Sequence, residues 1–192
     1  MSSALKTITT ALEQLGIPFL IGGSVASSAW GVGRQTFDVD IVARIAPPQV
    51  DPLRAALGKD WYVDSETART GIPAGRSFNV IHMLSGDKFD IFPAIGEFHA
   101  IQLERARAMP LEIGGEAVEC PVSTAEDILL AKLQWYRSGG EISERQWQDI
   151  QGILDQNPDF DLTYARSWAA RLRIDDLLER ALAEAGLRPD AR

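Results

Sequence analysis

The sequence predicts an α+β fold: a mixed or antiparallel sheet with helices, followed by a helical C-terminal region. Strand-like alternation and turn signals recur up to residue 120, whereas helical periodicity with capping motifs dominates from residue 121. The length of 192 residues suits one domain, or one domain with a small addition. We therefore divide the chain into residues 1–120 and 121–192.

The N-terminal segment predicts a helix, a buried strand and a second short helix. Apolar residues recur every three or four positions over residues 3–15, and Gly16 is a suitable stop. The run "IPFLIGG" is typical of a short buried strand. Ser24 follows and could cap a helix over about 25–31. Gly31 and Gly33 are expected to end this helix.

The middle of the chain predicts strands, one short helix and two hairpins. "TFDVDIVARI" alternates as a strand, and "PPQVDPLRAAL" favours a short helix started by proline. Residues 60–77 are polar and weakly periodic, so we expect a loop region with one short strand or helix at most. "FNVIHML" and "KFDIFPA" flank a turn signal and predict a hairpin, and "LEIGGEAVEC" predicts another.

The last 70 residues or so predict consecutive helices. Ser123 and Glu126 have capping-box spacing, and the helix that they open ends at a pair of glycines. Ser143 and Gln146 repeat the motif. Further helices are expected at about 161–172 and 174–186.

Composition narrows the classes of function. A net charge of −8 and a pI near 4.8 argue against nonspecific DNA or RNA binding, which depends on Lys and Arg. The sequence has neither a membrane-spanning run nor a signal peptide, so we expect a cytoplasmic protein with no membrane partner. Cys120 is the only cysteine and favours a buried thiol, while His82 and His99 lack the spacing of a zinc site.

Asp38 and Asp40 place two like charges on one face of a predicted strand. Residues i and i+2 of a strand point the same way, so the intervening apolar residues occupy the opposite face. Two neighbouring carboxylates repel each other unless a cation lies between them, and hard divalent cations prefer oxygen ligands. The alternative is an edge strand whose polar face lies in water.

Gly22, Gly23 and Ser24 form a strand-to-helix turn thirteen residues before the acids. Small residues let a ligand approach the backbone, and a helix N-terminus attracts phosphate. The alternative is a tight turn with a capping serine. Asp90 adds a third acid amid apolar residues, and three carboxylates could hold two metal ions. The alternative for Asp90 is a solvated aspartate on an edge strand.

These motifs together resemble the nucleotidyltransferase superfamily, whose members share a polymerase-beta-like palm. The resemblance covers "GGS", thirteen residues, "DVD" and the later "FDIF". It implies that Gly22, Gly23 and Ser24 contact the triphosphate and that Asp38 and Asp40 hold two Mg²⁺ ions. It also implies that Asp90 ligates the catalytic ion and assists the attacking hydroxyl.

"GVGRQTFDVD" is similar to small stand-alone members, including abortive-infection-type toxins, at Arg34 and Thr36. Those members also carry a Lys on one helix and an Arg and Asp on the next, which Lys132, Arg145 and Asp149 match. Lys132 lies in an apolar stripe, so it either extends to solvent or binds an anion such as phosphate. Arg145 and Asp149 could instead form a surface salt bridge.

The function implied is magnesium-dependent transfer of a nucleoside monophosphate from an NTP to a hydroxyl acceptor, with release of pyrophosphate. Without a basic track, the acceptor stays open between tRNA, another RNA, protein and a small molecule; Arg69 and Arg76 are candidate contacts for it or for the triphosphate. One alternative is a noncatalytic nucleotide- or partner-binding module, such as a toxin–antitoxin component with a cognate partner protein. Another is a structural or oligomerising protein whose acidic strand faces solvent.

Overall fold

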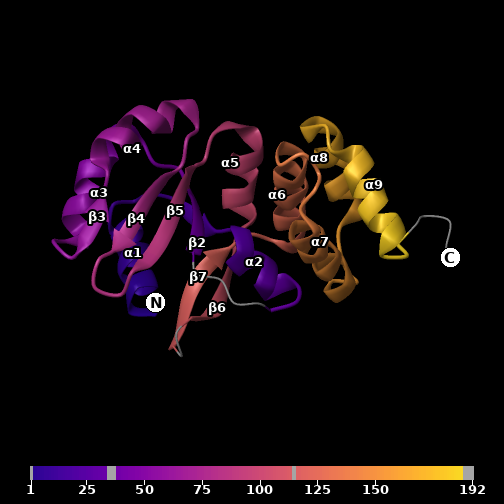
Figure 1. Ribbon diagram of the computed structural model, residues 1–192, viewed down its shortest axis with the longest axis horizontal. Coiled ribbons are helices and arrows are strands. Elements are labelled where there is room, and N and C mark those ends of the chain that lie inside the picture. The colour runs from indigo at the N-terminus through magenta and orange to yellow at the C-terminus, as the bar shows by residue number, and fades with distance from the viewer. Residues whose placement is uncertain (1, 34–37, 114–115, 188–192) are drawn as a thin grey trace. The chain divides into compact units, whose positions relative to one another are not determined.

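The computed structural model describes residues 2–33, 38–113 and 116–187 (Figure 1). The chain forms two compact units. The first comprises Met1–Gly22 and Thr36–Ser123, and the second comprises Gly23–Gln35 and Thr124–Arg192. Every strand belongs to the first unit, and the second unit is helical within its described residues. The predicted division after residue 120 stays a prediction, but residues 23–33 group here with the late helices.

A seven-stranded mixed sheet forms the centre of the first unit, with the strand order β3-β4-β5-β2-β1-β7-β6. The strands are β1 (Phe19–Ile21), β2 (Asp38–Ala43), β3 (Trp61–Val63), β4 (Phe78–His82), β5 (Asp87–Pro93), β6 (Arg107–Ile113) and β7 (Glu116–Val122). Two pairs are parallel, β2 with β5 and β1 with β7, and the other neighbours are antiparallel. The two parallel pairs join strands that are far apart in the sequence.

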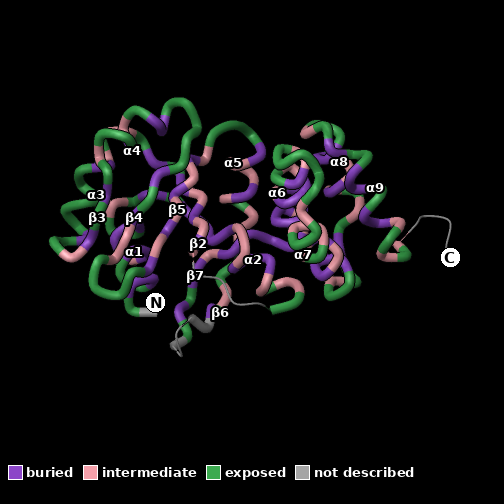
Figure 2. Tube along the Cα trace, in the orientation of Figure 1, coloured by how far each residue is buried: buried purple, intermediate pink, exposed green. Residues whose placement is uncertain are grey.

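In the described part of the chain, four helices belong to the same unit as this sheet. They are α1 (Ser2–Gln14), α3 (Val50–Leu57), α4 (Ser65–Gly71) and α5 (Gly96–Arg105), with short 3-10 turns at Pro47–Gln49 and Ile72–Ala74. Helix α1 contacts α3 and β7, and α3 contacts β3. Leu5, Ile8 and Leu12 on α1 are fully buried, as are alternate strand residues, so buried positions line the sheet (Figure 2). This core fixes the register that positions the acidic face.

The second unit contains α2 (Gly23–Trp30), α6 (Ala125–Ser138), α7 (Glu144–Gln156), α8 (Leu162–Leu172) and α9 (Asp175–Glu184). Helix α6 packs on each of the other four helices, and α2 also packs on α7. The buried face of α6 carries Ile128, Leu129 and Leu133. Helix α2 therefore belongs to the core of this unit although it is encoded more than 90 residues before α6.

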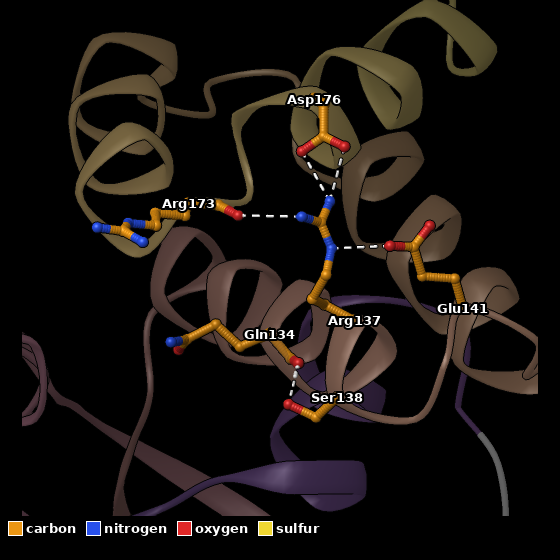
Figure 3. A network of polar contacts seen from close by, with 6 residues as sticks. All are labelled: Gln134, Arg137, Ser138, Glu141, Arg173 and Asp176. Atoms are coloured by element: carbon orange, nitrogen blue, oxygen red, sulfur yellow. Dashed lines mark hydrogen bonds and ion pairs between the residues drawn. The ribbon is translucent and has the colours of Figure 1, made fainter.

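Arg137 connects the end of α6 to the start of α9 (Figure 3). One of its terminal nitrogens lies 2.7 Å from both carboxylate oxygens of Asp176, and the other donates to the Arg173 carbonyl at 3.2 Å. Its Nε lies 2.7 Å from Glu141 Oε1. These contacts satisfy backbone and carboxylate acceptors at the junction of α8 and α9, so they hold the ends of three helices together.

The predicted α+β class is confirmed, as are both hairpins and the C-terminal helices; Gly114 and Gly115 of the second hairpin lie outside the described residues. Four local details differ. Thr124, not Ser123, caps α6, because its Oγ1 accepts from the Asp127 N–H. Ser24 is inside α2, which begins at Gly23. The segment 60–77 forms β3, α4 and a 3-10 turn, and helix α5 was not predicted.

Candidate active site

The acids lie on one face of two adjacent strands. In the parallel β2–β5 register, Asp38 is opposite Lys88 and Asp40 is opposite Asp90. The alternate residues, Val39 and Ile41 on β2 and Phe89 and Ile91 on β5, are fully buried on the other face. Burial of these apolar side chains specifies the register, because a slip by one residue would bury the charged set instead. Asp38, Asp40 and Asp90 therefore share one face of the sheet.

Lys88 lies between two of the acids. Its Nζ is 2.9 Å from Asp90 Oδ2 and 3.5 Å from Asp38 Oδ2. The hydrogen bond with Asp90 raises the pKa of Lys88 above its ordinary value, so the ammonium is fully charged at neutral pH. Sequence reasoning missed this residue, although its position two residues before Asp90 places it on the acidic face.

The two carboxylate oxygens of Asp90 differ in their hydrogen bonding. Its Oδ2 accepts from Lys88, whereas its Oδ1 is buried with no hydrogen-bond partner among the residues that the structure describes. Only 18% of the side chain is exposed. A buried carboxylate oxygen without a hydrogen-bond donor destabilises the fold. Binding of a cation or another ligand at Asp90 Oδ1 would remove that cost.

The oxygen donors of Asp38, Asp40 and Asp90 suit Mg²⁺, which prefers carboxylates and phosphates. The unpartnered Asp90 Oδ1 fits such a role. Over residues 2–33, 38–113 and 116–187, however, no three His, Cys, Asp or Glu side chains are already arranged around a metal position. Part of the reason is that the carboxylates of Asp38 and Asp90 converge on an ammonium group. The two-ion site stays a prediction.

The glycine turn adjoins Asp40 through the backbone. The Gly22 N–H donates to the Asp40 carbonyl at 2.9 Å, so this amide continues the β1–β2 pairing and is occupied. A Cβ at Gly22 would approach Val42 no closer than 3.6 Å, an ordinary contact, so packing within the unit does not demand glycine there. Gly23 has a φ of 52°, which side chains disfavour, and begins α2. Ser24 is the second residue of that helix.

Lys132 and Asp149 form a nearly buried ion pair inside the helical unit. Lys132 Nζ lies 2.6 Å from Asp149 Oδ2, and each side chain is only 10% exposed. The pair joins α6 to α7. The anion that Lys132 binds is thus a side chain of the same unit. The i, i+4 spacing on α7 had suggested a salt bridge between Asp149 and Arg145, but the structure shows Asp149 in contact with Lys132 on α6.

Two predicted residues, Arg34 and Thr36, lie outside the described residues. Arg69 is on α4 and contacts both carboxylate oxygens of Asp51 at 2.7 Å, so it is engaged on the surface of the first unit. Arg76 is exposed and follows the 3-10 turn at Ile72–Ala74. The structure does not group these two arginines with the acids.

Other reactive side chains are accounted for by local contacts. His82 Nδ1 lies 2.7 Å from Ser85 Oγ, which itself donates to Asp87; the serine is the middle member, so this is not the order of a catalytic triad. Burial raises the pKa of the Cys120 thiol to about 11, which suits an unreactive core residue. In the part of the chain that the structure describes, no helix is long and apolar enough to cross a membrane.

Comparison with known proteins identifies the fold. No protein-family model matches the chain, and no curated protein matches its sequence. The crystal structure of ANT(2")-Ia in complex with adenylyl-2"-tobramycin is similar, with a TM-score of 0.51 and 15% identity over 90% of this chain and 98% of that chain. An antigenic nucleotidyltransferase-like protein from Paracoccidioides brasiliensis gives a TM-score of 0.48 and 20% identity over 94% and 91% of the two chains. The expected fold is thus confirmed: the protein has the fold of the nucleotidyltransferases.

Proposed function

We propose that the protein is a magnesium-dependent nucleotidyltransferase, which transfers a nucleoside monophosphate from an NTP to a hydroxyl acceptor and releases pyrophosphate. The observation that carries the proposal is the shared face of β2 and β5, where Asp40 is opposite Asp90 and Asp38 lies two residues away. Three aspartates share this sheet face, and the fold is that of the nucleotidyltransferases. A solvated edge strand does not explain them, because β2 lies inside the sheet between β1 and β5.

Each acid has a distinct role in the proposal. Asp38 and Asp40 would hold the two Mg²⁺ ions, and Asp90 would share one of them through its unpartnered Oδ1. Bound Mg²⁺ supplies charge neutralisation of the phosphates and a lowered pKa of the attacking hydroxyl. Asp90 would also accept a hydrogen bond from the acceptor hydroxyl and so orient it for in-line attack on the α-phosphorus.

The glycine turn is the proposed triphosphate contact. Gly22 is not required by packing, and its own N–H is bonded to Asp40, so we assign it the role of leaving room for phosphate oxygens. Backbone N–H groups in the first turn of α2, which begins with Gly23 and Ser24, are the proposed donors, because a helix N-terminus attracts phosphate. Arg34, Thr36, Lys132 and Asp149 remain proposed contacts of the nucleotide.

The acceptor class is supported by the similar ANT(2")-Ia, which was solved in complex with adenylyl-2"-tobramycin. We therefore rank a hydroxyl on a small molecule first and tRNA second, since the net charge of −8 disfavours a polyanionic acceptor. With an NTP as donor, we place the reaction in the cytoplasm.

Replacing Asp38 by Asn tests the assignment. The substitution removes a charge from a half-exposed side chain, so we expect at least a roughly 10²- to 10³-fold fall in transfer with little change in melting temperature. Each labelled NTP would be incubated with Mg²⁺ and pools of RNA, protein and small molecules. Asp51→Asn, on the surface of α3, is the matched control. Retained transfer by Asp38→Asn at saturating Mg²⁺ contradicts the assignment, and nucleotide binding without transfer by the wild type favours the noncatalytic module.

A further inference from the structure

We propose that the Lys88 ammonium is an internal counter-ion of the acidic face and that a divalent cation has to displace it in order to bind. The inference deepens the proposed function, because it concerns the same three carboxylates. Lys88 is thus a positioning residue that holds Asp38 and Asp90 in place before metal arrives and sets how tightly the site takes up metal.

The arrangement of the strands creates the need for this counter-ion. Parallel pairing places Asp40 directly opposite Asp90, and neighbouring strands lie only about 4.8 Å apart. Like charges at such positions repel each other. Asp38 adds a third negative charge on the same face. The Lys88 ammonium contacts two of these acids, at 2.9 Å from Asp90 and 3.5 Å from Asp38.

The position of the ammonium makes it a competitor of the metal. A divalent ion bound between Asp38 and Asp90 would lie within a few ångströms of the Lys88 charge, and like charges at about 4 Å repel strongly at a partly buried site. One third of the Lys88 side chain is exposed, so it has room to swing toward solvent. Once it leaves, Asp90 presents both oxygens, including the Oδ1 that lacks a donor within the described chain.

Displacement predicts a gain of metal affinity when the charge is removed. Lys88→Met keeps the length of the side chain and removes the ammonium, so we expect it to bind Mn²⁺ about tenfold more tightly than the wild type. Binding would be measured on the full chain by titration calorimetry and by the loss of the free Mn²⁺ signal in electron paramagnetic resonance. In EDTA the variant should melt at a lower temperature than the wild type, and Mn²⁺ should raise its melting temperature more.

Two further variants separate this effect from a general change of charge. Lys59→Met removes the same charge from an exposed turn between α3 and β3 and should leave Mn²⁺ affinity unchanged. Lys88→Arg keeps the charge and should stay within about threefold of the wild type. Lys88→Gln covers the case in which Met prevents folding. In wild-type protein, Mg²⁺ should shift the side-chain ammonium resonance of Lys88 and leave that of Lys59 in place.

The outcomes distinguish this inference from the proposed function. Equal or weaker Mn²⁺ binding by Lys88→Met or Lys88→Gln, relative to Lys59→Met, overturns the counter-ion role, as does an absence of Mn²⁺ binding by every variant at millimolar concentration. Tighter binding by Lys88→Met without nucleotide transfer by the wild type supports the counter-ion role and overturns the enzyme assignment. If the wild type transfers nucleotide but Lys88→Met binds Mn²⁺ with unchanged affinity, the enzyme assignment is supported and the counter-ion role is overturned.

Discussion

The Lys132–Asp149 ion pair lies nearly buried between α6 and α7. A charge pair with each side chain only 10% exposed is expensive to desolvate, and hydrophobic residues of similar size often stabilise a protein as well or better. Its presence inside a helical core therefore favours a role beyond stability. The proposed role is contact with the nucleotide.

Breaking and then replacing the pair separates these roles. Lys132→Met removes the ammonium that Asp149 contacts at 2.6 Å and leaves a nearly buried carboxylate, so it should lower the free energy of unfolding by about 3–5 kcal/mol. The double variant Lys132→Met with Asp149→Leu should recover most of that loss, because it leaves neither charge. Denaturant titration measures both changes. Calorimetry with NTP and Mg²⁺ should find weakened binding in the stable double variant; unchanged binding would make the pair purely structural.

For single residues, the sequence correctly predicted which side chains share a strand face, but it did not predict which side chains form ion pairs. Period-two alternation correctly placed Asp38 and Asp40 on one face. The contact of Lys88 with Asp38 depends on parallel pairing of strands 50 residues apart, which no local pattern encodes. The pairing of Arg69 with Asp51 and that of Lys132 with Asp149 are equally nonlocal.

Among the elements, the glycine that follows helix α2 has a packing role that composition did not reveal. The sequence suggested that Gly31 and Gly33 simply break the helix. In the structure a Cβ at Gly31 would lie 2.9 Å from the Ser27 carbonyl oxygen and 3.1 Å from backbone atoms of Gly152 and Ile153. Gly31 therefore permits close packing of α2 against α7, a requirement that only the tertiary structure shows.

Substitution of the two glycines should have unequal effects. Gly31→Ala forces backbone apart and should cost about 1–3 kcal/mol of stability, whereas a Cβ at Gly33 meets nothing within 4 Å and Gly33→Ala should be nearly neutral. Thermal and urea unfolding of the two variants measures the difference. Equal stability of the two variants would contradict the close approach of α2 and α7.

Helix α9 is held by carboxylates that acid should neutralise. Arg137 lowers the pKa of Asp176, Arg166 lowers that of Glu179, and Trp147 followed by Arg180 lowers that of Glu184. Because the folded pKa values are depressed, these contacts stabilise the fold above the ordinary carboxyl values of about 3.8–4.5 and are lost as pH falls through the folded values. Figure 3 shows the Arg137 contact.

We therefore expect α9 to loosen between about pH 4.5 and pH 3, before the core of the sheet does. Hydrogen exchange followed by mass spectrometry, at matched intrinsic exchange rates, should show faster exchange in Asp175–Glu184 at the lower pH. Glu179→Gln should show part of that increase already at pH 6. Exchange in α9 that does not depend on pH would contradict the role of these pairs.

The elements that sequence reasoning missed are short or weakly amphipathic. Helix α5 buries only Phe98 and Gln102, which gives little periodic signal. Helix α4 has a usable signal in its Asp64 cap, whose carboxylate accepts from Thr67, but its seven residues include Gly71 and are mostly polar. By contrast, α1 was predicted from its long apolar stripe, and α6 was predicted from capping-box spacing at its start and a pair of glycines at its end.

At the scale of the whole molecule, the sequence could not show that the helical unit is discontinuous. A boundary after residue 120 follows the change in periodicity, yet α2 packs on α6 and α7, and Asn157 Nδ2 donates to the Trp30 carbonyl at 2.6 Å. Local patterns define elements, but the partners of an element are chosen by packing. Residues 23–33 are separated from α6 in the sequence by strands β2–β7.

A fragment of residues 124–192 should therefore be less stable than the helical unit in the intact chain. Without α2, the α6 and α7 surfaces that cover Val25 and Ala26 are exposed to water, and burial of one valine alone contributes about 1.5–3 kcal/mol. We expect reduced helicity, dye binding to exposed apolar surface and a broad melting transition in the fragment. A peptide of residues 22–33 added in trans should restore helicity and sharpen the transition, whereas the same peptide with Val25→Asp should not. Cooperative melting of the fragment alone, at the temperature at which these helices melt in the full chain, would show that α2 contributes nothing to the core of the helical unit.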